Sequence, residues 1–360
     1  MKKTLLAAAL LAGFAGAAHA QSSVTLYGIV DAGLNYTKVS GENSKLGIDS
    51  GNQYQSRLGV RGSEDLGNGL KAIFNLENGF TVDNGNSLQG GKLWGRYAYV
   101  GLDSATLGRL TLGRTVNLQY AWAANTISPF GLGWGNASVR NTLAYNDYDL
   151  NGGQVNNSAY YYSPVVYGFQ GAVGYSFAND PNAESEVAGA SRNNRLIDLG
   201  LKYSNGPLQA VVTYQYLNPS QATPNNGKFK NLTLGANYDF GVVAVYAGYA
   251  NAKGIRNPGT WNTSGAYAGT GYASGATSAN FTKDNAWTLG LSAPLGPGKA
   301  YAAYQKATQS KVKGFALGYV YDLSKRTNLY TYFAQNELHD WTANKSLDAR
   351  QFAVGLQHRF

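Results

Sequence analysis

Charged side chains set among hydrophobic ones are the first candidates for chemistry in this chain. In an extended segment Arg57 lies on the opposite face from Leu58 and Val60, because successive strand side chains point to opposite faces. An arginine on a lipid-facing surface at the bilayer midplane would cost ~2–4 kcal/mol, which favours a watery face for Arg57. Lys71 and Glu77 share one face of the following segment, and apolar side chains take the other. Such charges act on ions through their field, so they predict the lining of a water-filled passage.

Catalytic groups of the usual kinds are scarce. The chain has no Cys, which excludes disulfide frameworks, thiolate metal sites and thiol nucleophiles. Of its three His, His19 lies near the start, and His339 and His358 have no suggestive Ser or Asp beside them apart from Asp340. The Gly-rich stretches lack the Lys-Ser or Lys-Thr of a phosphate loop, and no spaced set of oxygen ligands indicates a metal site. We therefore expect no enzyme, no cofactor and no metal, although chemistry by carboxylates alone stays open.

The elements that must position these charges are strands. In residues 346–360 every second position back from Phe360 is mostly apolar or aromatic, and the positions between are polar or small. The same period of two recurs along the chain, in segments joined alternately by short turns and by long polar connections rich in Gly, Asn and Asp. Roughly sixteen segments can be counted, with fourteen or eighteen as alternatives, and each has room for a spanning strand of ~9–11 residues.

The start of the chain predicts export. Lys2 and Lys3 precede a short apolar stretch that ends in Ala18-His19-Ala20, so residues 1–20 are expected to be a signal peptide and 21–360 a single β-barrel domain. No later apolar run reaches the ~18 residues of a membrane-spanning helix. The 27 Tyr and 46 Gly suit a barrel, in which only alternate side chains face lipid.

These patterns together predict an all-β fold, a transmembrane antiparallel 16-stranded β-barrel. A closed barrel satisfies every backbone polar group in hydrocarbon. A secreted β-sandwich would also show alternation, but it would not need short and long connections to alternate. The formal charge of +9 is spread over single residues, so a positive lining that favours anions is expected rather than a nucleic-acid partner.

Five stretches resemble the general diffusion porins of Gram-negative bacteria, especially those of β-proteobacteria. They are residues 23–33 (SVTLYGIVDAG), 56–70 (SRLGVRGSEDLGNGL), 95–102 (GRYAYVGL), 111–114 (TLGR) and the terminal strand that ends in Phe360. The resemblance covers the chain after the signal segment. It implies a homotrimer of barrels in the outer membrane, in contact with its lipid, which passes small hydrophilic solutes and ions. It also implies a third loop that folds into the lumen, and recognition of Phe360 by the outer-membrane assembly machinery.

The resemblance also implies a pore constriction. Arg96 and Arg114 would join Arg57 on one wall, although Arg96 and Arg114 share their parity with apolar residues. Residues 117–157 would form the inward loop, with Pro129 and Phe130 in a turn where relatives often carry a glutamate. The loop has no acidic residue from 117 to 145, and Asp147 and Asp149 follow only later.

The opposing field of an arginine wall and an acidic loop is therefore thinned, and we expect a weak to moderate preference for anions. The wall also departs from the family at Ile29, where some relatives carry Lys. A channel specific for a sugar or an organic anion is the alternative, with Trp122 and Trp134 as a stacking surface on the loop.

Overall fold

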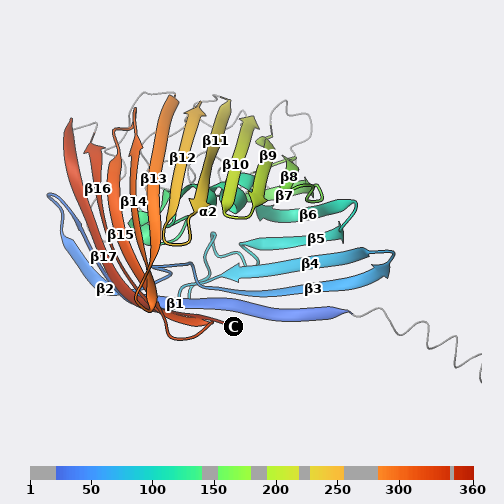
Figure 1. The fold of residues 1–360 in the computed structure, drawn as a ribbon, viewed down its shortest axis with the longest axis horizontal. Helices are drawn as coiled ribbons and strands as arrows, with labels where there is room; N and C mark the ends of the chain where they lie inside the picture. The colour runs from blue at the N-terminus through green and yellow to red at the C-terminus, as the bar shows by residue number, and fades with distance from the viewer. Residues whose placement is uncertain (1–21, 140–152, 180–192, 219–227, 255–282, 341–343) are drawn as a thin grey trace, which may run out of the picture.

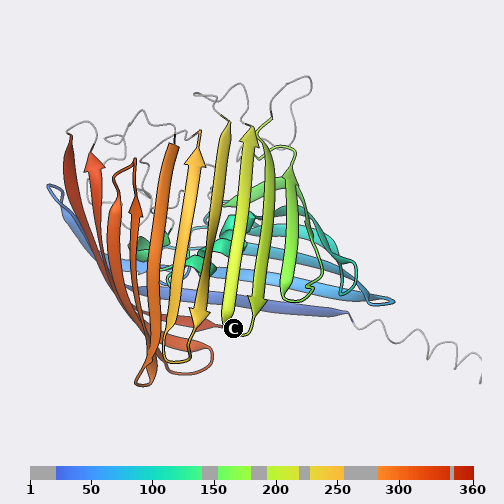
Figure 2. The ribbon, with the colours of Figure 1, turned by 45° about the horizontal axis from the view of Figure 1, so that its top comes forward.

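A computed structural model describes residues 22–139, 153–179, 193–218, 228–254, 283–340 and 344–360. All the strands in these ranges belong to one antiparallel sheet that closes on itself (Figures 1 and 2). In chain order they are β1 (Ser23–Val39), β2 (Ser44–Ser50), β3 (Arg57–Gly67), β4 (Leu70–Gly79), β5 (Tyr97–Ser104), β6 (Gly108–Val116), β7 (Gln154–Tyr162), β8 (Phe169–Ser176), β9 (Arg195–Asn205), β10 (Leu208–Asn218), β11 (Phe229–Asp239), β12 (Ala244–Lys253), β13 (Lys283–Leu295), β14 (Gly298–Ala307), β15 (Lys313–Asp322), β16 (Thr327–Asp340) and β17 (Lys345–Arg359).

Seventeen strand elements make sixteen barrel strands, because β2 and β3 occupy one position in the sheet. β2 pairs with the second half of β1, from Ala32–Ser50 to Lys38–Ser44, and β3 pairs with the first half, from Ser23–Ser63 to Ile29–Arg57. The ring closes where β1 pairs with β17, from Ile29–Arg359 to Val39–Ala349. The predicted closed antiparallel barrel is confirmed, with its number of strands.

The second barrel strand differs from the sequence expectation. Judged by alternation alone, the strand would begin near Gln53 after a polar connection over residues 38–52, but β2 lies within that connection. Leu46 and Ile48 are the two large apolar side chains of β2, and both are exposed on the outer face. The other positions are Gly, Ser, Lys and Asp, so the alternation is too weak to recognise in the sequence. The strand is then interrupted over residues 51–56, where Gly51 adopts a positive φ of 71°.

The two faces of the wall follow the predicted alternation. On β11 the side chains of Asn231, Thr233 and Asn237 are buried, whereas Leu232 and Leu234 between them are exposed. On β17 the buried positions are odd-numbered and the exposed apolar ones even-numbered. A surface of large exposed apolar side chains is what a lipid-facing wall requires. The described residues include no helix both long and apolar enough to cross a membrane.

Connections differ in length between the two ends of the barrel. The turns at one end are short, as between β9 and β10, where Gly206 has a φ of 56°, and the chain also ends there (Figure 2). We call this the short-turn end and the opposite one the long-loop end. Several connections at the long-loop end run through residues outside the described ranges.

One segment after β6 leaves the wall. Residues 117–139 contain a π-helical turn η1 (Gln119–Ala123), the short helix α2 (Ala124–Ile127) and a 3₁₀ turn η2 (Gly135–Ala137). α2 contacts β10, β11, β12 and β13, and η2 contacts β15 and β16, so the segment lies inside the ring and crosses to its far side (Figure 1). Glycines make the approach possible: a Cβ on Gly248 would lie 2.5 Å from Cβ of Ile127. We call residues 117–139 the inner segment.

Candidate functional site

The inner segment is fixed to the barrel wall at its start by polar side chains. Asp198 of β9 accepts a hydrogen bond from the backbone N–H of Leu118 at 2.7 Å. On β11, Thr233 accepts one from the side-chain amide of Gln119 at 2.5 Å, and Asn237 donates one to the carbonyl of Thr126 at 3.0 Å. These wall residues lie on the lumen-facing parity of their strands, where a soluble core would place apolar side chains.

The far part of the inner segment is fixed in the same way. Gln351 of β17 accepts from the backbone N–H of Asn136 at 2.7 Å, and Asn336 of β16 donates to the Asn136 carbonyl at 3.1 Å. Gln305 of β14 donates to the carbonyl of Ser138 at 3.1 Å. Side chains from strands far apart in the sequence therefore hold one backbone in place.

An aromatic cluster packs the tip of the segment. Phe130 is fully buried and lies edge-on to Trp134, with ring centroids 5.5 Å apart. Trp134 also meets Tyr301 at 5.3 Å and Tyr332 at 5.8 Å. Pro129 lies against β13, where a Cβ on Gly290 would be 2.4 Å from its Cδ. Phe130, Pro129 and Trp134 therefore serve to seat the segment against the wall.

The wall that faces the inner segment carries a cluster of charge. Arg96 is 2% exposed, and its Nε lies 2.5 Å from Oε1 of Glu77, which is 3% exposed. Arg96 also donates to the side chain of Gln55, and Tyr27 donates to Oε2 of Glu77 at 2.8 Å. Arg96 stands just before β5 begins, so it escapes the outward parity of the even-numbered residues of that strand. Its charge is matched by a buried carboxylate.

Arg57 differs from Arg96 in having no such partner. It opens β3 on the lumen-facing parity and is half-buried. In the part of the chain that the structure describes it makes no ion pair, and its Nε has no hydrogen-bond acceptor. Its positive charge is therefore uncompensated by direct contact.

A cavity of about 640 Å³ lies between this wall and the inner segment. Arg57, Arg96 and Tyr97 line it from the wall, and the segment contributes a row of uncharged residues, which are Tyr120, Ala121, Asn125, Leu132, Gly133 and Gly135. We call this space the upper chamber, since it also reaches residues of the long-loop end such as Asp83. The inner segment, described to Val139, contains no acidic residue.

The remaining predicted site residues lie elsewhere. Lys71 shares the lumen-facing parity but lies six positions along β4 from Glu77, beside the short turns. There it is the strand-register partner of Asp65 on β3 and Asp103 on β5. Arg114 falls on the parity of the exposed Leu110 and Leu112 and donates to the carbonyl of Gly95 at 2.8 Å and to Asn156. The structure thus brings Arg57, Arg96 and Glu77 together and leaves Lys71 and Arg114 outside the group. Asp147 lies outside the described residues.

Asp31 is a site residue that sequence reasoning missed. Its carboxylate is fully buried and accepts hydrogen bonds from the backbone N–H groups of Gln53 and Tyr54, at 3.2 and 2.9 Å. Tyr330 and Gln357 donate to it from β16 and β17, at 2.7 and 3.1 Å. Asp31 therefore holds the backbone of the interruption between β2 and β3 in place. The available signal was an acidic residue on the polar parity of the first strand.

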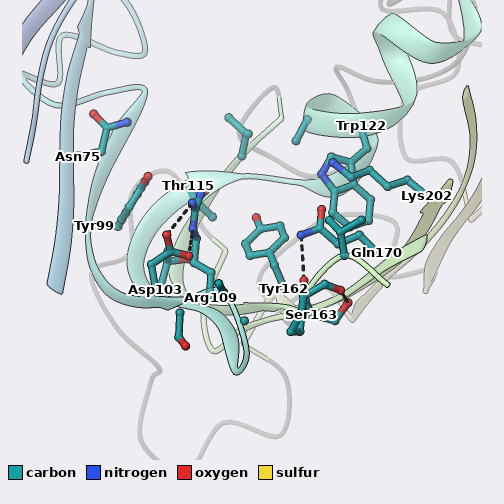
Figure 3. A pocket seen from close by; sticks show the side chains of 18 of the residues that line it. Asn75, Tyr99, Asp103, Arg109, Thr115, Trp122, Tyr162, Ser163, Gln170 and Lys202 are labelled. Atoms are coloured by element: carbon teal, nitrogen blue, oxygen red, sulfur yellow. Dashed lines mark hydrogen bonds and ion pairs between the residues drawn. The ribbon is translucent and has the colours of Figure 1, made fainter. Parts of the chain in front are cut away.

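A second cavity, of about 560 Å³, lies on the short-turn side of the inner segment (Figure 3). We call it the lower chamber. Tyr97 and Ala121 line both chambers, so this pair lies between the two. Arg109 makes two bonds to Asp103 in the lower chamber, at 3.0 and 3.2 Å. Within the described ranges no three His, Cys, Asp or Glu side chains gather as a metal site would require.

A sequence model of Gram-negative porins matches residues 7–340. The chain is 40% identical to an outer membrane porin protein of Bordetella pertussis, with all of both chains covered. It is 37% identical to outer membrane porin protein 32 of Delftia acidovorans, over 92% of this chain and 88% of that one. Among solved structures, an anion-selective porin from Comamonas acidovorans superposes with a TM-score of 0.73 and 27% identity, over 94% of this chain and 100% of the other.

Proposed function

Because this chain belongs to the Gram-negative porin family, it is an outer-membrane channel for passive diffusion of small hydrophilic solutes, and we propose that its constriction favours anions. The observation that carries the proposal is Arg57, whose guanidinium makes no ion pair within the described residues and lines the upper chamber opposite an inner segment without acidic residues. Such a fixed charge raises the local concentration of anions and lowers that of cations.

The other charges of the upper chamber balance more closely. Lys45 lies 3.0 Å from Asp49, and Arg96 is paired with Glu77 behind the chamber surface. Asp83 is exposed at the long-loop end and accepts a hydrogen bond from its neighbour Asn84. The excess charge nearest the inner segment then rests on Arg57. The porin from Comamonas acidovorans is anion-selective, which supports the same sign here.

The constriction that we propose consists of Arg57, Arg96 and Glu77 on the wall, opposite the row of uncharged residues on the inner segment. Pro129 and Phe130 take part indirectly, because they fix the segment against the far wall. Screening limits the range of the field, since the Debye length at physiological salt is ~8 Å. The preference for anions should therefore be moderate and should weaken as salt is added.

We also propose the assembly that the sequence predicts: cleavage of residues 1–20, a homotrimer in the membrane, and recognition of Phe360 during insertion. The placement of Phe360 is compatible with this role, because its backbone pairs with Gly28 at 3.1 and 3.2 Å while the residue is 41% exposed. Native electrophoresis and cross-linking of the purified protein test the trimer. Mass measurement of the exported protein tests the cleavage.

The experiment that tests the anion preference is the reversal potential of the purified channel in a planar bilayer between unequal KCl solutions. An anion-preferring pore gives a reversal potential of the sign set by the chloride gradient. A potential of the opposite sign would overturn the proposed preference, and a protein that carries no ions would overturn the channel itself.

A further inference from the structure

The lower chamber combines aromatic rings with a cation, Lys202, that has no ion-pair partner among the described residues. Tyr97, Tyr99, Trp122 and Tyr162 line it, and Figure 3 shows the last three with Lys202 around the same space. The rings of Trp122 and Tyr162 are tilted by 57° with centroids 5.9 Å apart. Faces and edges of aromatic side chains are good partners for another aromatic ring. The chamber volume of about 560 Å³ falls in the range of small-molecule sites, ~300–1,000 Å³.

Lys202 supplies the charge. It lies on β9 at the lumen-facing parity, and its ammonium sits 4.8 Å from the ring centroid of Trp122. The side chain is half-buried, and among the described residues it makes no ion pair. A cation held against an aromatic face and partly withdrawn from water can still form a strong charge-assisted hydrogen bond with an anion.

The acidic residue of the chamber does not meet that need. Asp103 is the one carboxylate among the described residues that line it, and Arg109 binds both of its oxygens. The pair leaves a net charge of one positive unit, at Lys202. Among the described residues that line the chamber, a carboxylate solute therefore meets no uncompensated negative charge beside Lys202.

We propose that the lower chamber is a binding subsite for monocyclic aromatic carboxylates, with the carboxylate on Lys202 and the ring among Tyr99, Trp122 and Tyr162. The proposal rests on the proposed function, because the solute must reach the chamber through the passage. Small aliphatic acids lack a ring for the aromatic wall, and neutral aromatic solutes lack the charge for Lys202. Occupation of the chamber obstructs the passage beside Tyr97 and Ala121, so binding appears as block of the ionic current.

Benzoate is the probe for the test, with acetate and benzyl alcohol as comparisons that each keep one half of its chemistry. We expect benzoate to reduce the single-channel conductance in a saturable way, and acetate and benzyl alcohol at equal concentration to do so much less. Block should set in faster when benzoate is added at the short-turn end, which opens directly onto the lower chamber. The orientation of the channel in the bilayer can be determined by adding protease to one side, with a cleavage site engineered at the long-loop end.

Two lysines form a matched pair of variants. Lys202→Gln should raise the half-blocking concentration of benzoate about fivefold, the factor that corresponds to one exposed charge pair of ~1 kcal/mol. Lys299 also lies over an aromatic ring, 5.9 Å from the centroid of Tyr301, but it lines a different chamber on the short-turn side. Lys299→Gln removes the same charge and should leave the half-blocking concentration unchanged.

Several outcomes would overturn the subsite. Equal block by acetate and benzoate would remove the role of the rings. Equal effects of Lys202→Gln and Lys299→Gln would mean that the field of the whole lumen acts, and no site. Either result is compatible with an anion-preferring reversal potential, so the subsite can fail while the proposed function stands. A third variant, Tyr162→Leu, keeps the charge and should weaken block by benzoate while leaving the reversal potential in KCl unchanged.

Discussion

Arg57 offers a sharp test of how this pore selects ions. Replacement by Gln removes one positive charge that has no direct partner in the described residues and keeps a polar side chain of similar length. An ion that passes about 5 Å from a unit charge in water interacts with it by about 0.8 kcal/mol. Screening with a Debye length of about 8 Å reduces this to about 0.4 kcal/mol at physiological salt. The low-dielectric wall makes the value a lower bound.

The energy acts with opposite sign on chloride and potassium, so the two contributions add in the permeability ratio. Arg57→Gln should therefore lower the ratio of anion to cation permeability about fourfold near physiological salt. At 1 M salt the Debye length is about 3 Å, and the same arithmetic leaves less than a twofold effect. Reversal potentials of wild type and variant, measured in KCl gradients centred on each salt level, give both ratios.

Arg114→Gln is the matched control, because it removes the same charge from a residue on the outward parity of β6. Its reversal potential should stay close to that of the wild type. The reasoning is refuted if Arg57→Gln leaves the permeability ratio unchanged at physiological salt, or if its effect is as large at 1 M. An equal shift from Arg114→Gln would show that the assignment of these two residues to opposite faces is wrong.

Three further predictions concern the stability of the barrel and of the inner segment. Glu77→Gln leaves Arg96 buried without its carboxylate and should lower the free energy of unfolding by about 3–5 kcal/mol in a urea titration, while it increases the preference for anions. Gln351→Leu removes the acceptor of the Asn136 N–H and should weaken the anchoring of the segment by about 1–3 kcal/mol, seen as larger fluctuations of the open-channel current. Leu234→Arg places a charge on the lipid-facing surface and should destabilise the barrel in vesicles by about 2–4 kcal/mol.

Two of these changes have a control variant, and the third has an outcome that would contradict it. Glu337→Gln breaks an ion pair with Lys313 that is largely open to water, so it should cost no more than about 1 kcal/mol. A similar cost for Glu337→Gln and Glu77→Gln would contradict the role given to burial. Leu234→Ala separates lost apolar area from added charge. Steady open-channel current in Gln351→Leu would show that the bonds to β14 and β16 suffice to hold the segment.

Much of the barrel could be predicted from the sequence, because period-two alternation directly encodes a wall with lipid on one side and water on the other. The face of Arg57, Lys71 and Glu77 followed from this rule alone. The rule failed where the chain leaves regular strand geometry. Arg96 stands before its strand begins, and β2 is too short and too polar to show its alternation.

The anchoring of the inner segment was beyond sequence reasoning for a different reason. Asp198, Gln305 and Gln351 each occupy an ordinary lumen-facing position, and nothing in the local sequence shows that they bind one backbone segment from separate strands. The register between strands far apart in the chain decides which polar side chains meet, and this register cannot be inferred from the local pattern of a single sequence. Trp122 and Trp134 would be the stacking surface of a solute-specific channel, yet Trp134 is buried in the packing of the segment against β14 to β16.

The interruption at residues 51–56 ties two events of assembly to each other. Gln53 accepts a hydrogen bond from the N–H of Trp134 with its carbonyl, and its own N–H is held by Asp31. Asp31 in turn accepts hydrogen bonds from Tyr330 of β16 and Gln357 of β17, which reach it only when β17, with β16 beside it, pairs with β1. A ring that has not closed therefore lacks part of the hydrogen bonding that holds the inner segment. Closing the ring between β1 and β17 and anchoring the inner segment depend on the same carboxylate. The membrane is thereby protected from a wide pore that lacks its constriction.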